Sequence, residues 1–190
     1  MTWLKRNLTR ANCDAPQRLE RFEAVFVNQR PILKWIALAI VGNEFVAERC
    51  VQGAKRTAIH ASVYVEWMGR WLRSVTARTA VEAVHEDLKE SEGWYKDRDC
   101  AHGEHSGMSD DYMATVLACD IDEFTSCLDV LARSVLVLRG VLGFTTDECA
   151  LHMQVDRRAV SAAYCRAMSW IEQRAAIEQG PQWPIGSRGR

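Results

Sequence analysis

The segment of residues 131–173 constrains the fold more than any other part of the chain. Its apolar residues recur at helical spacing up to Leu142, and Gly143, which permits a helix C-cap, comes directly afterwards. Thr145 then stands three residues before Glu148, which is the spacing of a capping box. The segment therefore predicts one helix that ends near Gly143 and a second, short helix that begins at Thr145.

A third helix is predicted after a tight turn, because Asp156 is a good N-cap. Its buried stripe is expected to hold four residues: Val160, Tyr164, Ala167 and Ile171. Its opposite face, with Arg157 at the N-terminal end, is expected to hold Arg158, Ala162, Cys165 and Arg166. An apolar back and arginines at the tip are what a helix needs to read a major groove. The sequence thus predicts a helix-turn-helix.

At these residues the chain resembles the C-terminal promoter-binding domain of the extracytoplasmic-function (ECF) group of bacterial sigma factors. The matching positions run without a gap into the third helix: Arg133, Leu138, Arg139, Gly143, Thr145, Glu148, Ala150, Met153, Val155, Val160, Arg166 and Ala167. The resemblance implies that the third helix binds the −35 element of a promoter. The DNA-binding residues that it implies are Arg157, Arg158, Ser161, Ala162, Cys165 and Arg166.

The front half of the chain carries a second resemblance to the same family. Residues 26–56 predict two amphipathic helices separated at Gly42–Asn43. The stretch Ala47–Gln52 resembles the motif on the helix that docks on the RNA polymerase core. The polymerase-binding residues that this resemblance implies are Glu48, Arg49 and Gln52.

A later stretch, Trp71–Thr79, resembles the helix with which the family melts and reads the −10 promoter element. The resemblance implies roles in that contact for Trp67, Trp71 and Arg78. Trp67 and Trp71 are one helical turn apart, and one of them is expected to pack in the core. An exposed tryptophan at this place could stack on an unpaired promoter base, as in proteins that hold single strands.

Several residues depart from the family pattern. Arg49 stands where an aspartate is usual, and Ser161 and Ala163 stand where lysine and arginine are common. Because phosphate affinity rests largely on lysine and arginine, two functions stay open. The chain is either a divergent alternative sigma factor, or a sigma-like interaction protein that binds an anti-sigma factor or polymerase without reading DNA. An ordinary helix-turn-helix repressor would leave the N-terminal resemblance unexplained.

The predicted architecture is all-α, with two small helical domains joined by a flexible linker. Residues 18–88 are predicted to form the domain for core polymerase and the −10 element, and residues 111–178 the helix-turn-helix domain. The polar, glycine-containing segment 89–110 is predicted to be the linker, and residues 179–190 a disordered tail.

The composition argues against several classes of protein. The 190 residues carry 24 basic and 25 acidic side chains, whereas a free-standing DNA-binding domain is usually basic, so affinity is expected to come partly from the polymerase. No glycine-rich phosphate loop, nucleophile elbow or paired-histidine zinc motif occurs, so neither catalysis nor a cofactor is expected. The sequence has no run of about 18 apolar residues and no secretory signal. A cytoplasmic protein without a membrane segment is therefore expected.

The seven cysteines contain no Cys-x-x-Cys pair. Cys100, His102 and His105 lie close together in the predicted linker and would suit zinc if a fourth ligand joined them. Such residues also gather by chance in polar linkers, and no metal is predicted. Cys165 is expected to be an inert thiol on the outward face of its helix, where oxidation would disturb DNA contact. The odd number of cysteines favours a reducing cytoplasm.

Overall fold

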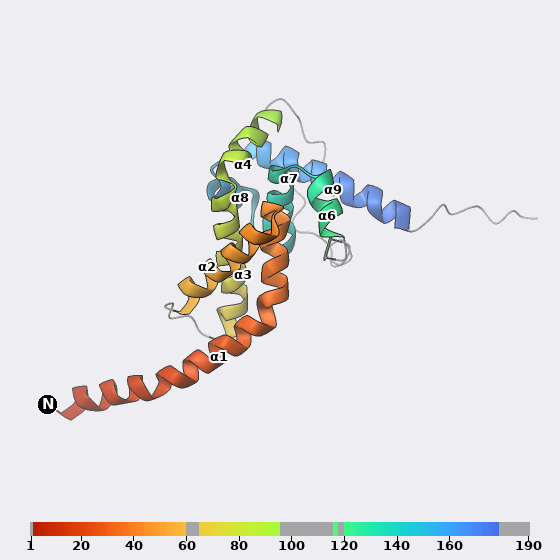
Figure 1. Ribbon diagram of the computed structural model, residues 1–190. Helices are drawn as coiled ribbons and strands as arrows, with labels where there is room; N and C mark the ends of the chain where they lie inside the picture. Colours follow the sequence, from red (N-terminus) through yellow and green to blue (C-terminus); the bar gives the residue numbers. More distant parts are fainter. Residues whose placement is uncertain (1, 60–64, 96–115, 118–119, 179–190) are drawn as a thin grey trace, which may run out of the picture. The chain divides into compact units, whose positions relative to one another are not determined.

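The computed structural model describes residues 2–59, 65–95, 116–117 and 120–178 (Figure 1). Helices make up the regular structure of these ranges and no strand occurs in them, which confirms the predicted all-α class. Contacts between residues divide the chain into two compact units, Met1–Lys89 (unit 1) and Glu90–Arg190 (unit 2). The predicted tail and residues 96–110 of the predicted linker lie outside the described residues.

Unit 1 is built from long helices that pack on one another: α1 (Thr2–Val41), α2 (Glu44–Ile59) and α3 (Val65–Ala83). The predicted break between the first two helices is confirmed. Gly42 adopts a positive φ of 67°, a conformation that glycine reaches without strain. The side-chain oxygen of Asn43 then accepts a hydrogen bond from the backbone N–H of Val46 (3.0 Å). This bond satisfies a donor in the first turn of α2.

Apolar side chains from α1, α2 and α3 meet in the core of unit 1: Phe22, Phe26, Leu33, Ile36, Ile40, Val51, Met68 and Leu72. At the edge of this core Lys55 pairs with Glu23 (2.9 Å) and lies 4.9 Å from the centre of the Phe26 ring. The α2 helix contributes three buried alanines, Ala47, Ala54 and Ala58. Such small side chains let neighbouring helices approach closely.

One part of α1, Leu19–Val41, is long and apolar enough to cross a membrane, judged by length and composition alone. Charged residues interrupt its apolar sequence, so it contains no continuous apolar run of that length. Core helices of soluble proteins pass the same test, and Leu33, Ile36 and Ile40 are completely buried inside unit 1. Part of the apolar composition of the segment therefore serves the core of unit 1.

Unit 2 is arranged around its longest described helix, α9 (Arg157–Glu178), which is blue in Figure 1. Four elements pack against it: the 3-10 turn η1 (Gly93–Tyr95), α7 (Val130–Val135), the π-helical turn η2 (Leu136–Val141) and α8 (Thr146–Met153). The short helix α6 (Ile121–Cys127) contacts α7, and its Phe124 meets Trp170 of α9 edge to face. The largest buried side chains of the unit include Phe124, Leu131, Leu136, Leu138, Met153 and Ile171.

The helix predicted to end at Gly143 contains a π turn that the sequence pattern did not indicate. The backbone N–H of Leu142 donates to the carbonyl of Val137, five residues back (3.1 Å). A π turn holds one more residue than an α turn, and here the consecutive residues Leu136 to Leu138 are all buried. Gly143 then adopts a φ of 74°, so the helix ends where the glycine predicted.

Residues 89–95 differ from the flexible linker predicted to begin there. The helix α4 (His85–Glu92) continues to Glu92, and η1 extends the helical backbone to Tyr95. Ser91 and Tyr95 are buried, with 3% and 2% of their surface exposed. Packing of this short segment outweighs its polar composition. The boundary between the two units lies inside α4, between Lys89 and Glu90.

Candidate nucleic-acid interface

The short helix α8 begins with the capping box that the sequence predicts. The Thr145 hydroxyl accepts a hydrogen bond from the backbone N–H of Glu148 (3.2 Å), and the Glu148 carboxylate accepts one from the backbone N–H of Thr145 (2.7 Å). The second bond, together with one from the Thr145 hydroxyl, lowers the pKa of Glu148 below its ordinary value. Two donors at the start of α8 are thereby satisfied.

The turn between α8 and α9 is tight. Gln154 adopts the left-handed conformation (φ 56°, ψ 41°), which costs a residue with a Cβ atom about 1–2 kcal/mol. The backbone N–H of Val155 donates to the carbonyl of Ala150 (3.2 Å), and the Val155 side chain is buried. Asp156 then caps α9, as predicted, by accepting from the backbone N–H of Arg158 (2.7 Å).

The back of α9 is buried as expected, since Val160, Tyr164, Ala167 and Ile171 all lie in the core of unit 2. The expectation for Ala162 is wrong, because only 6% of its surface is exposed. Ala162 stands one turn before Arg166, which lines a pocket with Trp94 and Tyr95 of η1, so this side of α9 is packed against other parts of the unit. Ser161 and Cys165 are half-buried. Of the six predicted DNA-binding residues, the exposed ones are therefore the arginines.

The two arginines of the first turn of α9 have different surroundings. Arg157 pairs with Asp147 of α8 across 3.2 Å, and both side chains are more than half exposed. Exposed pairs of this kind contribute at most about 1 kcal/mol, so Arg157 can exchange Asp147 for another anion at small cost. Arg158 is exposed beside it. The predicted reading face of α9 is the set Arg157, Arg158, Ser161, Ala162, Cys165 and Arg166, and its first two side chains are exposed.

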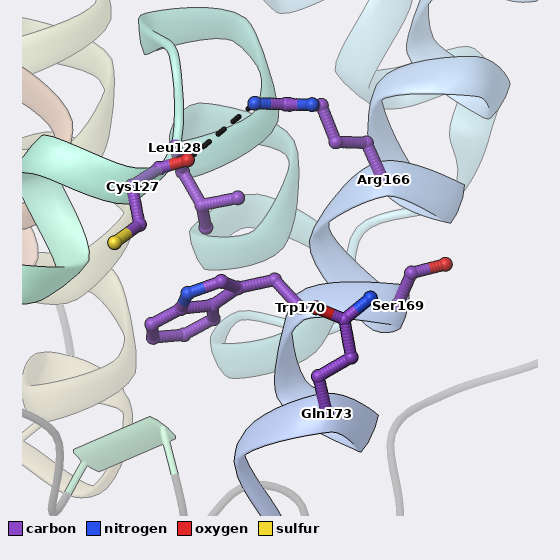
Figure 2. A pocket seen from close by; sticks show the side chains of 6 residues that line it. All are labelled: Cys127, Leu128, Arg166, Ser169, Trp170 and Gln173. Atoms are coloured by element: carbon purple, nitrogen blue, oxygen red, sulfur yellow. Dashed lines mark hydrogen bonds between the residues drawn. The ribbon is translucent and has the colours of Figure 1, made fainter.

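Arg166 is held by the fold. Its Nε lies 3.3 Å from Oδ2 of Asp129. One of its terminal nitrogens donates a hydrogen bond to the carbonyl of Cys127 (3.5 Å), which is the dashed line in Figure 2. In that view the indole of Trp170 extends from α9 toward Cys127 and Leu128. The pocket drawn there has a volume of about 530 Å³, and its lining comprises Cys127, Leu128, Arg166, Ser169, Trp170 and Gln173. Arg166 thus joins α9 to the α6–α7 corner.

Asp129 organises this corner, and the sequence analysis did not single it out. One oxygen of its carboxylate accepts from the backbone N–H groups of Leu131 and Ala132 (3.1 and 3.0 Å) and caps α7. The other oxygen accepts the Tyr95 hydroxyl as well as Arg166. The sequence carries one signal for this role, because an aspartate directly before a helical apolar run is typical of an N-cap.

Cys165 is not the free thiol that the sequence analysis expected. Its sulfur takes part in a disulfide bond, whereas Cys50, Cys127 and Cys149 are free. Cys127 is exposed, and Cys149 is completely buried. Burial raises the pKa of the Cys149 thiol to about 12, so this thiol stays protonated near neutral pH.

In unit 1 the residues predicted to bind polymerase are partly engaged with one another. The Glu48 carboxylate accepts hydrogen bonds from the Gln52 amide (2.8 Å) and from Arg30 of α1 (3.0 Å). The bond from Gln52, with a smaller effect of Arg30, lowers the pKa of Glu48. The spacing of Glu48 and Gln52 therefore also has a structural use, which is to tie α2 to α1. Arg49 is exposed beside them.

The α2 surface also carries an apolar residue that the sequence reasoning missed. Phe45 is 73% exposed in the first turn of the helix, near the 2.6 Å ion pair between Lys34 and Glu44. The signal was present in the sequence, since Phe45 falls outside the stripe formed by Ala47, Cys50 and Val51. An exposed aromatic side chain beside charged ones is typical of protein-contact surfaces.

The two tryptophans of α3 differ in their exposure, as predicted, but neither is completely buried. Trp67 is 59% exposed, and Trp71 is half-buried, while Met68 and Leu72 fill the core between them. Arg78 is exposed further along the helix and pairs with Glu82 one turn away (3.0 Å). The fold thus leaves most of the Trp67 side chain exposed, and stacking on a base requires an accessible aromatic ring.

The metal ligands considered in the sequence, Cys100, His102 and His105, lie outside the described residues. Within the described ranges no three histidine, cysteine, aspartate or glutamate side chains are grouped so that they could hold a metal ion.

Comparisons with known proteins give no relative for this chain. No protein-family model matches it, and neither a curated protein nor a solved structure is significantly similar to it. The interpretation of the two surfaces therefore rests on their residues and geometry.

Proposed function

We propose that the chain is a divergent alternative sigma factor that directs RNA polymerase core to promoters. Unit 2 would place the N-terminal turn of α9 in the major groove of the −35 element, and unit 1 would dock on the polymerase and hold the −10 element. This protein would carry out no catalysis, because RNA synthesis belongs to the polymerase. It would act in the cytoplasm, without a membrane segment.

The observation that carries this proposal is the arrangement of α8, the turn at Gln154 and α9. A short capped helix leads through a tight turn into a longer helix with a buried back, and Arg157 and Arg158 lie exposed at its tip. Recognition helices of helix-turn-helix proteins contact bases and phosphates with these N-terminal residues. The exposed ring of Trp67 in unit 1 adds independent support.

The ion pairs of the other two arginines favour a second candidate function. Arg157 pairs with Asp147 and Arg166 pairs with Asp129, and the whole chain has a formal net charge of −1. These features suit a sigma-like interaction protein that binds polymerase or an anti-sigma factor without reading DNA. The sigma-factor proposal requires that at least Arg158 contacts DNA.

Run-off transcription with purified core polymerase tests the two candidates on the promoter upstream of the gene for this chain. The wild-type chain should produce a specific transcript. Arg158→Ala should weaken specific promoter binding by about 1–3 kcal/mol if the side chain makes a bidentate base contact. Arg21→Ala is the matched control, since it removes the same charge from an exposed position of α1 in unit 1, away from the predicted polymerase-binding residues of α2.

The outcomes separate the candidates. A transcript that depends on Arg158 more strongly than on Arg21 supports the sigma factor. Binding to core polymerase with no transcript, and with no effect of Arg158→Ala, supports the interaction protein. A chain that does not bind core polymerase even at low salt contradicts both.

A further inference from the structure

A four-residue segment, Glu92–Tyr95, lies against α9 and is called the cover segment here. A carboxylate oxygen of Glu92 accepts a hydrogen bond from the backbone N–H of Asp156 (2.7 Å), at the point where α9 begins. At the other end of the segment, the Tyr95 hydroxyl binds Asp129, the same carboxylate that pairs with Arg166. The segment, which is itself part of unit 2, therefore contacts the unit near Asp156 and near Arg166, at the two ends of the predicted reading face.

The contact made by Glu92 uses a group that DNA would need. Backbone N–H groups at the start of a helix bind anions, and helix-turn-helix proteins direct them at DNA phosphates. Here the anion is supplied by a glutamate of the same chain. A phosphate and the Glu92 carboxylate cannot occupy the Asp156 N–H together.

The contact made by Tyr95 lies beside Arg166 of α9, because both side chains bind the Asp129 carboxylate. Trp94, Tyr95, Asp129 and Arg166 surround a small pocket of about 200 Å³. Tyr95 is 2% exposed, whereas Trp94 beside it is 58% exposed. The buried tyrosine anchors the segment, and the exposed tryptophan stands at the rim of the reading face.

We propose that the cover segment is an autoinhibitory device: in the free chain Glu92 occupies the backbone N–H of Asp156 at the start of α9, while Arg157 and Arg158 stay exposed, and the Glu92 end of the segment moves away when the duplex binds. This inference rests on the proposed DNA-binding role of α9. Because one hydrogen bond at a half-exposed position contributes little net stability, a duplex that offers several phosphates can displace Glu92. The free chain would then bind DNA weakly. Only molecules whose segment has moved away can bind, so the apparent affinity is the intrinsic affinity multiplied by the fraction of such molecules.

The first test compares two glutamates of α4 in the full chain. Glu92→Ala removes the contact with α9, whereas Glu90→Ala removes the same charge from an exposed position without a contact to Asp156. The probe is a fluorescent duplex of mixed sequence at low ionic strength. Glu92→Ala should raise the affinity about tenfold over Glu90→Ala, within the usual range of coupling between two states.

Adding Arg158→Ala to each variant distinguishes this inference from the proposed function. If duplex binding depends on Arg158 but Glu92→Ala and Glu90→Ala bind equally, the cover segment is not inhibitory and the proposed function stands. If no variant binds the duplex through Arg158, the proposed function fails, and the inference fails with it.

Hydrogen exchange gives a second readout that needs no substitution. Peptides covering residues 90–95 should exchange faster when the wild-type chain is saturated with duplex, because the segment has been displaced. Slower exchange on duplex binding would overturn the proposal, since it would mean that the segment belongs to the DNA interface itself.

Discussion

Unit 1 and unit 2 differ in how other segments contact the helix that carries the predicted DNA-binding side chains. On α3 of unit 1, Trp67 is 59% exposed, and its neighbours Met68 and Leu72 take the core positions. On α9 of unit 2, Ala162 is buried and Arg166 is held by an aspartate of α7's N-cap. Both helices show the same kind of amphipathic pattern in the sequence. Accessibility was decided by what other segments of each unit place beside the helix.

This contrast also bears on how the two surfaces would work. A single strand can stack on one exposed aromatic ring, so the Trp67 surface needs no rearrangement. A duplex needs a whole helix face, and part of that face in unit 2 is in contact with Glu92 and Tyr95. Binding of the −35 element is therefore expected to be the step that requires a conformational change.

The largest expected effect comes from placing a charge on the covered side of α9. Ala162→Glu should lower the free energy of unfolding by about 3 kcal/mol, because a buried carboxylate loses its hydration. Ala176→Glu is the matched control, since Ala176 is exposed on the same helix. The measurement is urea unfolding of the full chain. Equal losses of stability from the two substitutions would mean that the position of Ala162 on α9 is as exposed to solvent as the position of Trp67 on α3.

A medium effect is expected from the capping aspartates of unit 2. Asp129 caps α7 and also binds Tyr95 and Arg166, whereas Asp120 caps α6 through one bond to the N–H of Asp122 (2.9 Å). Asp120→Ala should cost about 1 kcal/mol, as for an ordinary N-cap. Asp129→Ala should cost about 2 kcal/mol, because charge-assisted bonds are lost as well. Thermal unfolding of both variants compares them, and equal losses would show that the Tyr95 and Arg166 contacts add nothing.

The smallest effect on stability is expected at the open surface of unit 1. Trp67→Ala should change the free energy of unfolding by no more than about 0.5 kcal/mol, since most of the ring is exposed. The same substitution should weaken binding of the non-template strand of the −10 element by about 1–3 kcal/mol if the ring stacks on a base. The measurement is the binding of this single strand to the complex of the protein with core polymerase. A large loss of stability would show that Trp67 is a core residue, and unchanged strand binding would remove it from the −10 surface.

Elements set by neighbouring residues were predictable from the sequence. The capping box of Thr145 and Glu148, the cap at Asp156 and the helix ends at Gly42 and Gly143 all depend on groups within a few residues of one another. Backbone sterics and short hydrogen-bonded rings determine such features locally. The buried stripe of α9 followed from helical periodicity for the same reason.

The sequence by itself therefore determined the all-helical class, the helix boundaries near α8 and α9, and the buried stripe of α9. It did not reveal that Glu92 binds the start of α9, 64 residues further along the chain, or that Tyr95 binds Asp129, 34 residues away. These contacts, the burial of Ala162 and the disulfide at Cys165 belong to the tertiary structure. Helical periodicity predicts which side of a helix can face a core, but it carries no information about which distant segment covers the remaining sides. That choice depends on packing among all the elements of a unit, and only the folded chain shows it.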